Sequence, residues 1–207
     1  DQGGRLLWLV VLLVCAILVS RFTEYFAPYE RSWNNPQQDR IRDVIHAIVN
    51  EASIIALLVI MPVAASLVPW PSFWPSSQAL WLQVGLAIIL IDAGITLVHF
   101  ASHRLNVLWR FHAVHHSVLH MYGFNGLLKH PVHQILEIMG GTLPWLFLGI
   151  PVEVAALGAF AVSIQLLLQH SNVDMKIGPL KYIWAVAPVH RHHHVASATE
   201  GDVNFGL

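Results

Sequence analysis

The chain has 207 residues and a formal net charge of −1; 56% of its residues are hydrophobic and only 11% are charged. Soluble domains carry about 25% charged residues, so this composition excludes an ordinary soluble protein and indicates membrane helices. The balanced charge gives no electrostatic basis for binding nucleic acid, and we expect no such partner. The one cysteine, Cys15, excludes an internal disulfide and a cysteine–histidine metal finger.

Apolar runs that approach the roughly 20 residues of a membrane-spanning helix recur along the chain. The first, residues 6–20, lies between Arg5 and Arg21. A signal peptide is the alternative there, and it is disfavoured because no small-residue cleavage site follows. The second run covers residues 52–69 and extends back to residue 45, and the third covers residues 79–100. We expect each of the three to span the membrane.

Two weaker runs follow, at residues 134–150 and 152–169, separated by Pro151. We interpret them as a helical hairpin that crosses the membrane at least in part. The sequence thus predicts an all-α polytopic membrane bundle of about three full spans plus a hairpin. It forms a single membrane-embedded domain over residues 1–207, with N-terminal transmembrane helices in residues 5–89.

The basic residues predict the orientation of this bundle. If the three runs span and the hairpin returns, all of the 11 Lys and Arg except Arg5 lie on one side. They are Arg21, Arg31, Arg40, Arg42, Arg104, Arg110, Lys129, Lys176, Lys181 and Arg191. The positive-inside rule makes that side cytoplasmic. The loop at residues 69–78 lacks Lys and Arg, and its tryptophans suit the opposite interface. We therefore expect a multi-pass integral membrane protein.

Histidine is the most unusual feature of the composition, because its 14 copies outnumber the 11 Lys and Arg. Three clusters follow or separate the apolar runs. They are His99 and His103; His112, His115 and His116; and His190, His193 and His194. Side chains at i, i+3 and i+4 lie on one helix face, so we expect each cluster to aim its imidazoles at one point. His170 follows the hairpin on the same side and is a ninth candidate.

Neutral imidazole is a good ligand for iron, zinc, copper and nickel, and spacing alone does not choose among them. Nine histidines exceed what one ion takes and suit two adjacent ions. The expected fold therefore carries a cytoplasmic, histidine-rich metal cap. His46, His120, His133 and His192 lie outside the spacing, and we favour their interpretation as interfacial polar residues. His130 is undecided between a ligand and a residue that supports a ligand.

A carboxylate inside a transmembrane run is costly and indicates function. Asp92 shares a helix face with Thr96, His99 and His103. The rise of about 1.5 Å per residue puts Asp92 roughly 10 Å from His99 along the helix axis. We therefore expect Asp92 to orient a histidine of another segment. A salt bridge with an arginine, or helix packing, is the alternative.

The order HxxxH, HxxHH and a later HxxHH resembles the fatty acid hydroxylase and sterol desaturase superfamily of membrane di-iron enzymes. The similarity covers about residues 90–207 and includes the run LWRFHAVHHS at 108–117. The HxN element at 170–172 and the DxNFG element at 202–206 are also similar to the family's. The residues that these elements add as tentative supports of the metal site, besides Asp92 and His130, are Asn172, Asp202 and Asn204.

The resemblance implies an O2-dependent oxidoreductase of lipid biosynthesis, a monooxygenase or desaturase that acts on C–H bonds of a lipid or sterol-like substrate. It implies two iron ions at the nine histidines, with zinc as an adventitious occupant, and O2 as co-substrate. The chain has no haem, flavin or nicotinamide motif, so we expect an external electron donor such as cytochrome b5 or a ferredoxin-type protein. A membrane metal transporter and a zinc-dependent membrane hydrolase are the alternatives. The first places ligands near the bilayer midplane, and the second requires a glutamate beside a histidine pair, which no cluster contains.

The chain departs from the family pattern at Phe100, Leu128 and His133, where the family often has Arg, Arg and Glu. These departures concern the substrate more than the metal site. The family usually continues past the DxNYG element to a Trp-Asp and a Phe-Gly-Thr sequence, which does not follow here. We therefore expect the sequence to be truncated at its C-terminal end.

Overall fold

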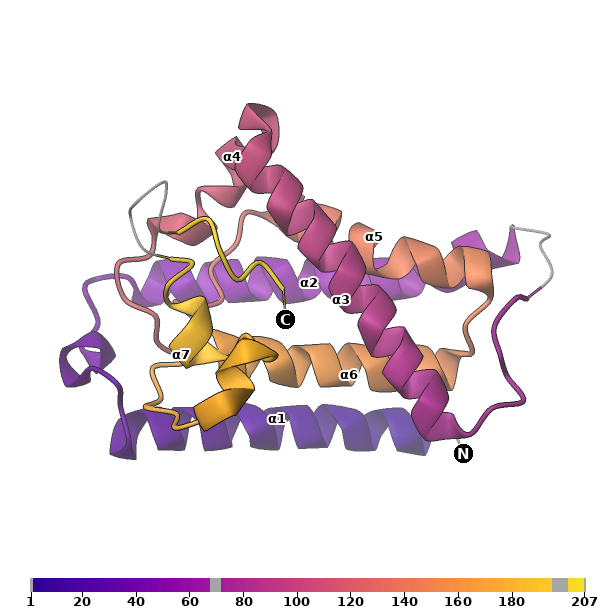
Figure 1. Ribbon diagram of the computed structural model, residues 1–207, viewed down its shortest axis with the longest axis horizontal. Helices are drawn as coiled ribbons and strands as arrows, with labels where there is room; N and C mark the ends of the chain where they lie inside the picture. Colours follow the sequence, from indigo (N-terminus) through magenta and orange to yellow (C-terminus); the bar gives the residue numbers. More distant parts are fainter. Residues whose placement is uncertain (1, 68–71, 195–200, 207) are drawn as a thin grey trace.

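The computed structural model describes residues 2–67, 72–194 and 201–206, without the side chains of residues 2–6 and of several positions between 54 and 65 (Figure 1). Its long helices are α1 (Gln2–Phe26), α2 (Arg40–Ser66), α3 (Leu80–Arg104), α5 (Pro131–Leu148) and α6 (Val152–Gln169). The short ones are α4 (Asn106–His112), α7 (Ala187–His190) and the 3-10 turns η1 (Arg31–Asn34), η2 (His115–Ser117) and η3 (Gly178–Tyr182). Within the described ranges there is no β-strand, which confirms the all-α prediction, and an isolated bridge pairs Pro28 with Val173.

Helix α3 is the centre of the bundle. It packs against α5 and α6, while α2 packs on α5 and α1 packs on α6. In Figure 1, α3 crosses obliquely in front of the other long helices. The buried apolar core lies where α3, α5 and α6 meet, and it consists of Trp74, Ala87, Ile91, Trp145, Val154 and Val162.

Two glycines let α3 and α5 approach closely. A Cβ atom on Gly94 would lie 2.1 Å from the carbonyl oxygen of Gly140, and one on Gly140 would lie 2.5 Å from Cγ2 of Val98. Membrane helices associate through such small residues because lipid offers no hydrophobic driving force between them. The glycines that weakened the apolar run at residues 134–150 therefore serve helix packing.

Three helices are long and apolar enough to cross a membrane, among the residues that the structure describes: Leu7–Phe26, Leu80–Arg104 and Val152–Gln169. The third is the second helix of the predicted hairpin, so α6 is long enough to cross fully rather than in part. The central side chains of α2 lie outside the described residues, so the predicted span at residues 52–69 stays a prediction. Two of the three predicted spans are thus found, in α1 and α3, and α6 of the hairpin is a further candidate. The protein is an integral membrane protein.

The hairpin turn lies beside the loop that precedes α3. The backbone N–H of Phe73 donates to the carbonyl oxygen of Leu148 (3.0 Å), and the hydroxyl of Ser72 donates to that of Gly149 (3.1 Å). Gly149 ends α5 with a φ of 69°, in the left-handed region that favours glycine. These two loops lie at the end of the bundle away from α4 and α7, as the hairpin interpretation requires (Figure 1).

Trp74 differs from the expectation for this loop. Its side chain is only 5% exposed, and its Nε1–H donates to Oε1 of Gln83 at 2.8 Å. The prediction of a tryptophan at the membrane interface is therefore wrong for Trp74, because a buried hydrogen-bond acceptor lets the indole enter the core. Trp70, the other tryptophan that we expected there, lies outside the described residues.

Candidate metal centre

Five histidines converge at the end of α3. Their ligand nitrogens all lie within 4.8 Å of one another; this five-histidine group consists of His99, His103, His112, His116 and His193. The Nε2 atoms of His99 and His193 are 2.8 Å apart, and Nε2 of His112 is 3.0 Å from Nε2 of both His103 and His116. Rings this close point their nitrogens into one small volume, which is the arrangement of ligands around an ion.

Four further histidines form a second group beside the first. This four-histidine group consists of His115, His170, His190 and His194, and its ligand nitrogens also lie within 4.8 Å of one another. Nε2 of His170 is 3.2 Å from Nε2 of His115, and Nε2 of His194 is 3.2 Å from Nε2 of His190. The groups are adjacent, since the rings of His116 and His194 stack with centroids 4.6 Å apart. Together they contain all nine histidines that the sequence singled out.

The two groups divide each HxxHH cluster between them. In both clusters the first and last histidines, at i and i+4, lie in one group, and the middle histidine lies in the other. The middle histidines are His115, in the four-histidine group, and His193, in the five-histidine group. Neighbouring side chains on a helical turn point about 100° apart, so the residue at i+3 is directed away from the one at i+4. The expectation that each cluster aims at one point is therefore wrong for these two clusters.

Three consecutive carbonyl oxygens hold histidines of both groups from behind. The Nδ1–H groups of His193 and His99 donate to the carbonyls of residues 203 and 205 at 2.9 Å, and that of His190 donates to residue 204 at 3.3 Å. We call residues 203–205 the strap. With the proton on Nδ1, each ring keeps the Nε2 lone pair for the group that it faces. The tautomers are assigned from these contacts.

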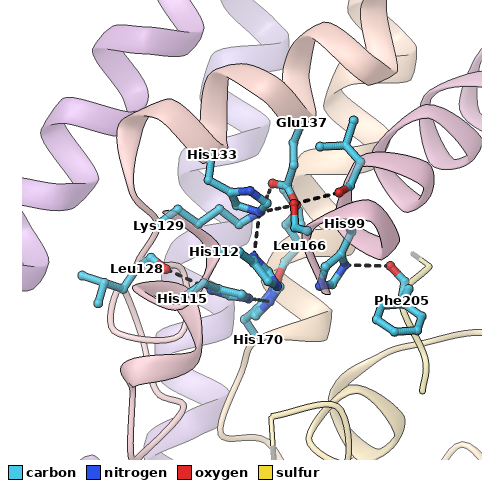
Figure 2. Close-up of polar contacts among 12 residues, drawn as sticks. His99, His112, His115, Leu128, Lys129, His133, Glu137, Leu166, His170 and Phe205 are labelled. Carbon is cyan, nitrogen blue, oxygen red and sulfur yellow. Dashed lines mark hydrogen bonds and ion pairs between the residues drawn. The ribbon is translucent and has the colours of Figure 1, made fainter. Parts of the chain in front are cut away.

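Two more backbone carbonyls act in the same way on the four-histidine group (Figure 2). Nδ1–H of His115 donates to the carbonyl of Leu128 at 2.9 Å, and Nδ1–H of His170 donates to that of Leu166 at 3.1 Å. Leu128 is one of the departures from the family pattern, and its side chain is 2% exposed. Because the contribution comes from its backbone, the identity of this side chain leaves the support of His115 intact.

Burial keeps these imidazoles neutral. It lowers the pKa of His115 and His190 well below the usual value, and neighbouring imidazoles add to the effect. Burial likewise lowers the pKa of His116 to about 2 and that of His170 to about 3. A neutral imidazole offers a lone pair, so the rings are in the protonation state that a metal requires.

Two of the tentative supporting residues lie beside the strap or at a helix start. Asp92 accepts a hydrogen bond from Oγ1 of Thr96 at 3.1 Å and faces residue 206, where a Cβ atom would lie 3.7 Å from its Oδ1. Its expected role of orienting a histidine stays a prediction. His130 accepts from the backbone N–H of Val132 at 3.1 Å and so caps α5; it is in neither group.

The other three hold backbone segments in place. Asn172 is fully buried and donates through Nδ2 to the carbonyl of Glu30 at 2.9 Å. Asp202 forms a salt bridge with Arg104. Asn204 has a φ of 57° and donates through Nδ2 to the carbonyl of Val189 at 3.2 Å. These three side chains act on the segment next to a histidine, at 170 or 190 or in the strap, whereas the backbone carbonyl of Asn204 accepts from the imidazole of His190.

Of the four histidines expected to be interfacial, three do lie away from both groups. Nδ1 of His46 is 3.1 Å from the carbonyl of Lys129, the ring of His120 lies against Trp33, and His192 is exposed. His133 differs, because its side chain is 0% exposed and its Nε2 lies 2.8 Å from Nδ1 of His112. The interfacial interpretation of His133 is wrong: one turn into α5, it faces the protein interior.

Glu24 is a residue near the centre that the sequence did not reveal. It lies in the last turns of α1, is 4% exposed, and accepts from the backbone N–H groups of Gly123 (3.0 Å) and Asn172 (2.9 Å). Gly123 lies in the loop between His116 and Leu128, and Asn172 lies in the loop that directly follows His170. A carboxylate at the end of an apolar run is ordinary in sequence, because water can solvate it there, so no signal distinguished Glu24.

Comparison with known proteins agrees with these observations. A family model described as fatty acid hydroxylase matches residues 84–207. The chain is 31% identical over 212 residues to the ornithine lipid hydroxylase OlsE of Rhizobium tropici, covering 98% of this chain and 64% of that protein. It is 33% identical to the alkylglycerol monooxygenase of Danio rerio and 30% to that of Homo sapiens, each over 61% of this chain and 26% of the relative. No solved structure matches.

Proposed function

Because the chain belongs to the fatty acid hydroxylase family, we propose that it is an O2-dependent membrane hydroxylase that acts on a C–H bond of a lipid. The observation that supports this most directly is the pair of adjacent histidine groups, which provides ligands for two metal ions side by side. The curated relatives are longer than this chain, so the activity is proposed for the protein to which these residues belong.

We assign the metals as two iron ions, one in each group. Neither group contains Asp, Glu or Cys among the described residues, and an all-imidazole donor set suits iron as well as zinc, copper and nickel. The resemblance to membrane di-iron enzymes favours iron in this proposal, and zinc would be an adventitious occupant. When bound, the ions would supply the activation of O2 and the oxidising power to attack an unactivated C–H bond.

The chain's own part is to orient the ligands and to exclude water. The strap and the carbonyls of Leu128 and Leu166 fix the rings, and most of the imidazoles are buried. His103 and His116 are half-buried, with the ring of Trp109 5.2 Å and 5.5 Å from theirs. This is the more open side of the centre, and we assign it to the approach of the lipid chain.

The substrate is a membrane lipid, and the product is its alcohol. By their names, one relative hydroxylates an ornithine lipid and the others oxygenate alkylglycerols, which favours hydroxylation over desaturation. Hydroxylation consumes one O2, two electrons and two protons, and yields the alcohol and one water. We therefore assign the electrons to a separate donor, such as cytochrome b5 or a ferredoxin-type protein.

The histidine groups lie on the cytoplasmic side in this proposal, because the basic residues follow the positive-inside rule. Ser117 is exposed next to the groups. In a variant with Cys15→Ser and Ser117→Cys, an impermeant thiol reagent is expected to label residue 117 only after the cytoplasmic face is opened. Labelling from the outside of intact cells would reverse the assigned orientation.

The test of the activity is lipid analysis under ¹⁸O2. A host that makes the protein is expected to accumulate a lipid heavier by one ¹⁸O atom, and His193→Ala is expected to abolish it. His192→Ala is the matched control, because this neighbour is exposed and lies in neither group. Product formation without O2, or full turnover by His193→Ala, contradicts the proposal.

A further inference from the structure

A buried polar unit lies next to His112, on the side of α5 (Figure 2). It consists of Lys129, His133 and Glu137, whose exposed fractions are 6%, 0% and 4%. Nε2 of His133 lies 3.1 Å from Oε1 of Glu137, and Nζ of Lys129 forms a salt bridge with the other carboxylate oxygen. We call these three residues the α5 unit.

The α5 unit is costly to bury, and packing alone does not account for it. Taking a carboxylate and an ammonium out of water costs several kcal/mol per ion, which their mutual attraction offsets only in good geometry. An apolar side chain in a helix with this composition would avoid the cost. Charged groups in such a place are functional by default, as expected for Asp92 from the sequence.

His133 connects this unit to the metal centre. Its Nε2 lies 2.8 Å from Nδ1 of His112, whose own Nε2 belongs to the five-histidine group. The other Nδ1 contacts described for the two groups go to neutral backbone carbonyls. His112 therefore differs from the other ligands, because its Nδ1 contacts the side chain of His133, which in turn lies next to the carboxylate of Glu137.

The ring of His133 is placed for this contact. Its Nδ1 is buried without a hydrogen-bond partner among the described residues, and its Nε2 is the atom next to both His112 and Glu137. When Nδ1–H of His112 donates to this Nε2, the Nε2 has no proton for Glu137, so the carboxylate acts on it through its charge. Lys129 is anchored in turn, because its carbonyl lies 3.1 Å from Nδ1 of His46 on α2. The unit thus links α2 and α5 to one particular imidazole.

A small cavity lies between the α5 unit and histidines of both groups. It has room for about one water, roughly 10 Å³, and Lys129, Glu137, His99, His115 and His170 contribute to its lining. The charged ends of the α5 unit consequently face the space between the two groups.

We propose that His133 and Glu137, neutralised by Lys129, are positioning residues for His112 that set the affinity and reduction potential of the five-histidine metal site. The proposal rests on the proposed function only in requiring that both groups hold a metal. A partner that accepts a hydrogen bond from a ligating imidazole, here Nε2 of His133, fixes the ring and raises its basicity, and loss of such a partner costs about 10- to 100-fold in metal affinity. The negative charge of Glu137 beside the same Nε2 adds to this effect. The four-histidine site, which meets the charged ends of the α5 unit only across this cavity, is expected to lose less affinity.

The test compares two amides at position 133. The side-chain end of Gln occupies the place of Nε2 of His, whereas that of Asn occupies the place of Nδ1. His133→Asn and Glu137→Gln are expected to weaken one of the two iron sites about 10- to 100-fold, with a changed Mössbauer signal and a higher reduction potential mainly for that iron. His133→Gln is expected to keep the wild-type Mössbauer signal, because its side-chain end takes the place of Nε2. His130→Asn, which keeps the cap of α5, is the control.

Unchanged signals for both irons in His133→Asn and Glu137→Gln overturn the proposal. Equal loss of both irons in all three variants, His133→Gln included, also overturns it, because the α5 unit would then serve folding only. The wild-type protein could bind two metal ions and yet oxidise no lipid. In that case the same variants are compared with cobalt(II) as the probe, and its absorption spectrum reports on each site. Two bound metals without lipid oxidation contradict the proposed function, but the comparison of the variants at positions 133 and 137 can still be made. Wild-type protein that binds no metal contradicts both the proposed function and the role of the α5 unit.

Discussion

In the four-histidine group, His115, His170 and His190 each donate to a backbone carbonyl, and His194 is half-buried. In the five-histidine group, His103 and His116 are half-buried, and the charged α5 unit lies behind His112. Backbone carbonyls give fixed geometry with little influence on charge, whereas a carboxylate behind a histidine changes how strongly the imidazole donates to a metal. The comparison teaches that two neighbouring sites with the same donor atoms have unequal electronic surroundings.

The largest effect is expected from removing one ligand in each group. His115→Ala removes a ligand from the four-histidine group, and His193→Ala removes one from the five-histidine group. Each is expected to reduce the iron content from about two per chain to about one and to abolish lipid hydroxylation, because a shared reacting group needs both ions. Metal analysis of the purified variants measures this. Two irons retained in either variant would break the assignment of the groups.

Acid is expected to act on both groups together. Unfolded imidazoles take up protons below the usual pKa of 6.5, whereas the folded pKa is about 3 for His170 and about 2 for His116. The unfolded state therefore binds more protons over that window, and stability is lost as the pH falls from about 6.5 toward about 3. These pKa values apply to the metal-free protein, which we expect to unfold in this pH window, as measured by circular dichroism. Metal-free protein that stays fully helical at pH 3 would contradict this.

A smaller and one-sided effect is expected at Glu24. Glu24→Ala leaves the buried N–H of Asn172 without its acceptor, which costs about 1–3 kcal/mol, and the part-buried N–H of Gly123 adds a smaller cost. Because the Asn172 loop also carries His170, the iron of the four-histidine group is expected to weaken more than the other. Thermal melting and metal titration measure the two effects. Glu30→Gln is the control, an exposed carboxylate whose side chain bonds to Ser32.

The smallest effect is expected at the salt bridge between Arg104 and Asp202. The Arg104 side chain is 50% exposed, and exposed pairs contribute about 0.2–1 kcal/mol. Arg104→Ala is expected to leave both iron sites occupied and to lower the melting temperature slightly, with the effect further reduced at high salt. Loss of the iron bound by His99 and His193 would show instead that this bridge holds the strap in place.

The spacing of the histidines in the sequence predicted most of the candidate site, because pairs at i and i+4 meet within a single helical turn. It placed His99 and His103 together and selected all nine histidines that the two groups contain. Their role as ligands stays a prediction. Spacing could not assign the middle histidine of a cluster, since its direction depends on which segments surround the turn.

The supporting residues were harder to predict, because their partners are distant in sequence. Glu137 lies 25 residues after His112 and meets it only through His133, so neither local spacing nor charge reveals the link. The charge argument was applied to Asp92, yet it fits Glu137 equally well, because both are carboxylates inside apolar helices. Trp74 was misplaced for a similar reason: its hydrogen bond with Gln83 forms only when the loop folds over α3.

The strap has a consequence for the order in which the centre is assembled. Residues 203–205 follow all nine histidines in the chain, so they leave the ribosome after every one of them. Until they emerge, His99, His190 and His193 lack the carbonyls that set their rings. The helices therefore enter the bilayer with an unfinished centre, and metal acquisition becomes a late step of biogenesis. A released chain that ends before residue 203 is consequently expected to insert normally and yet to bind metal poorly.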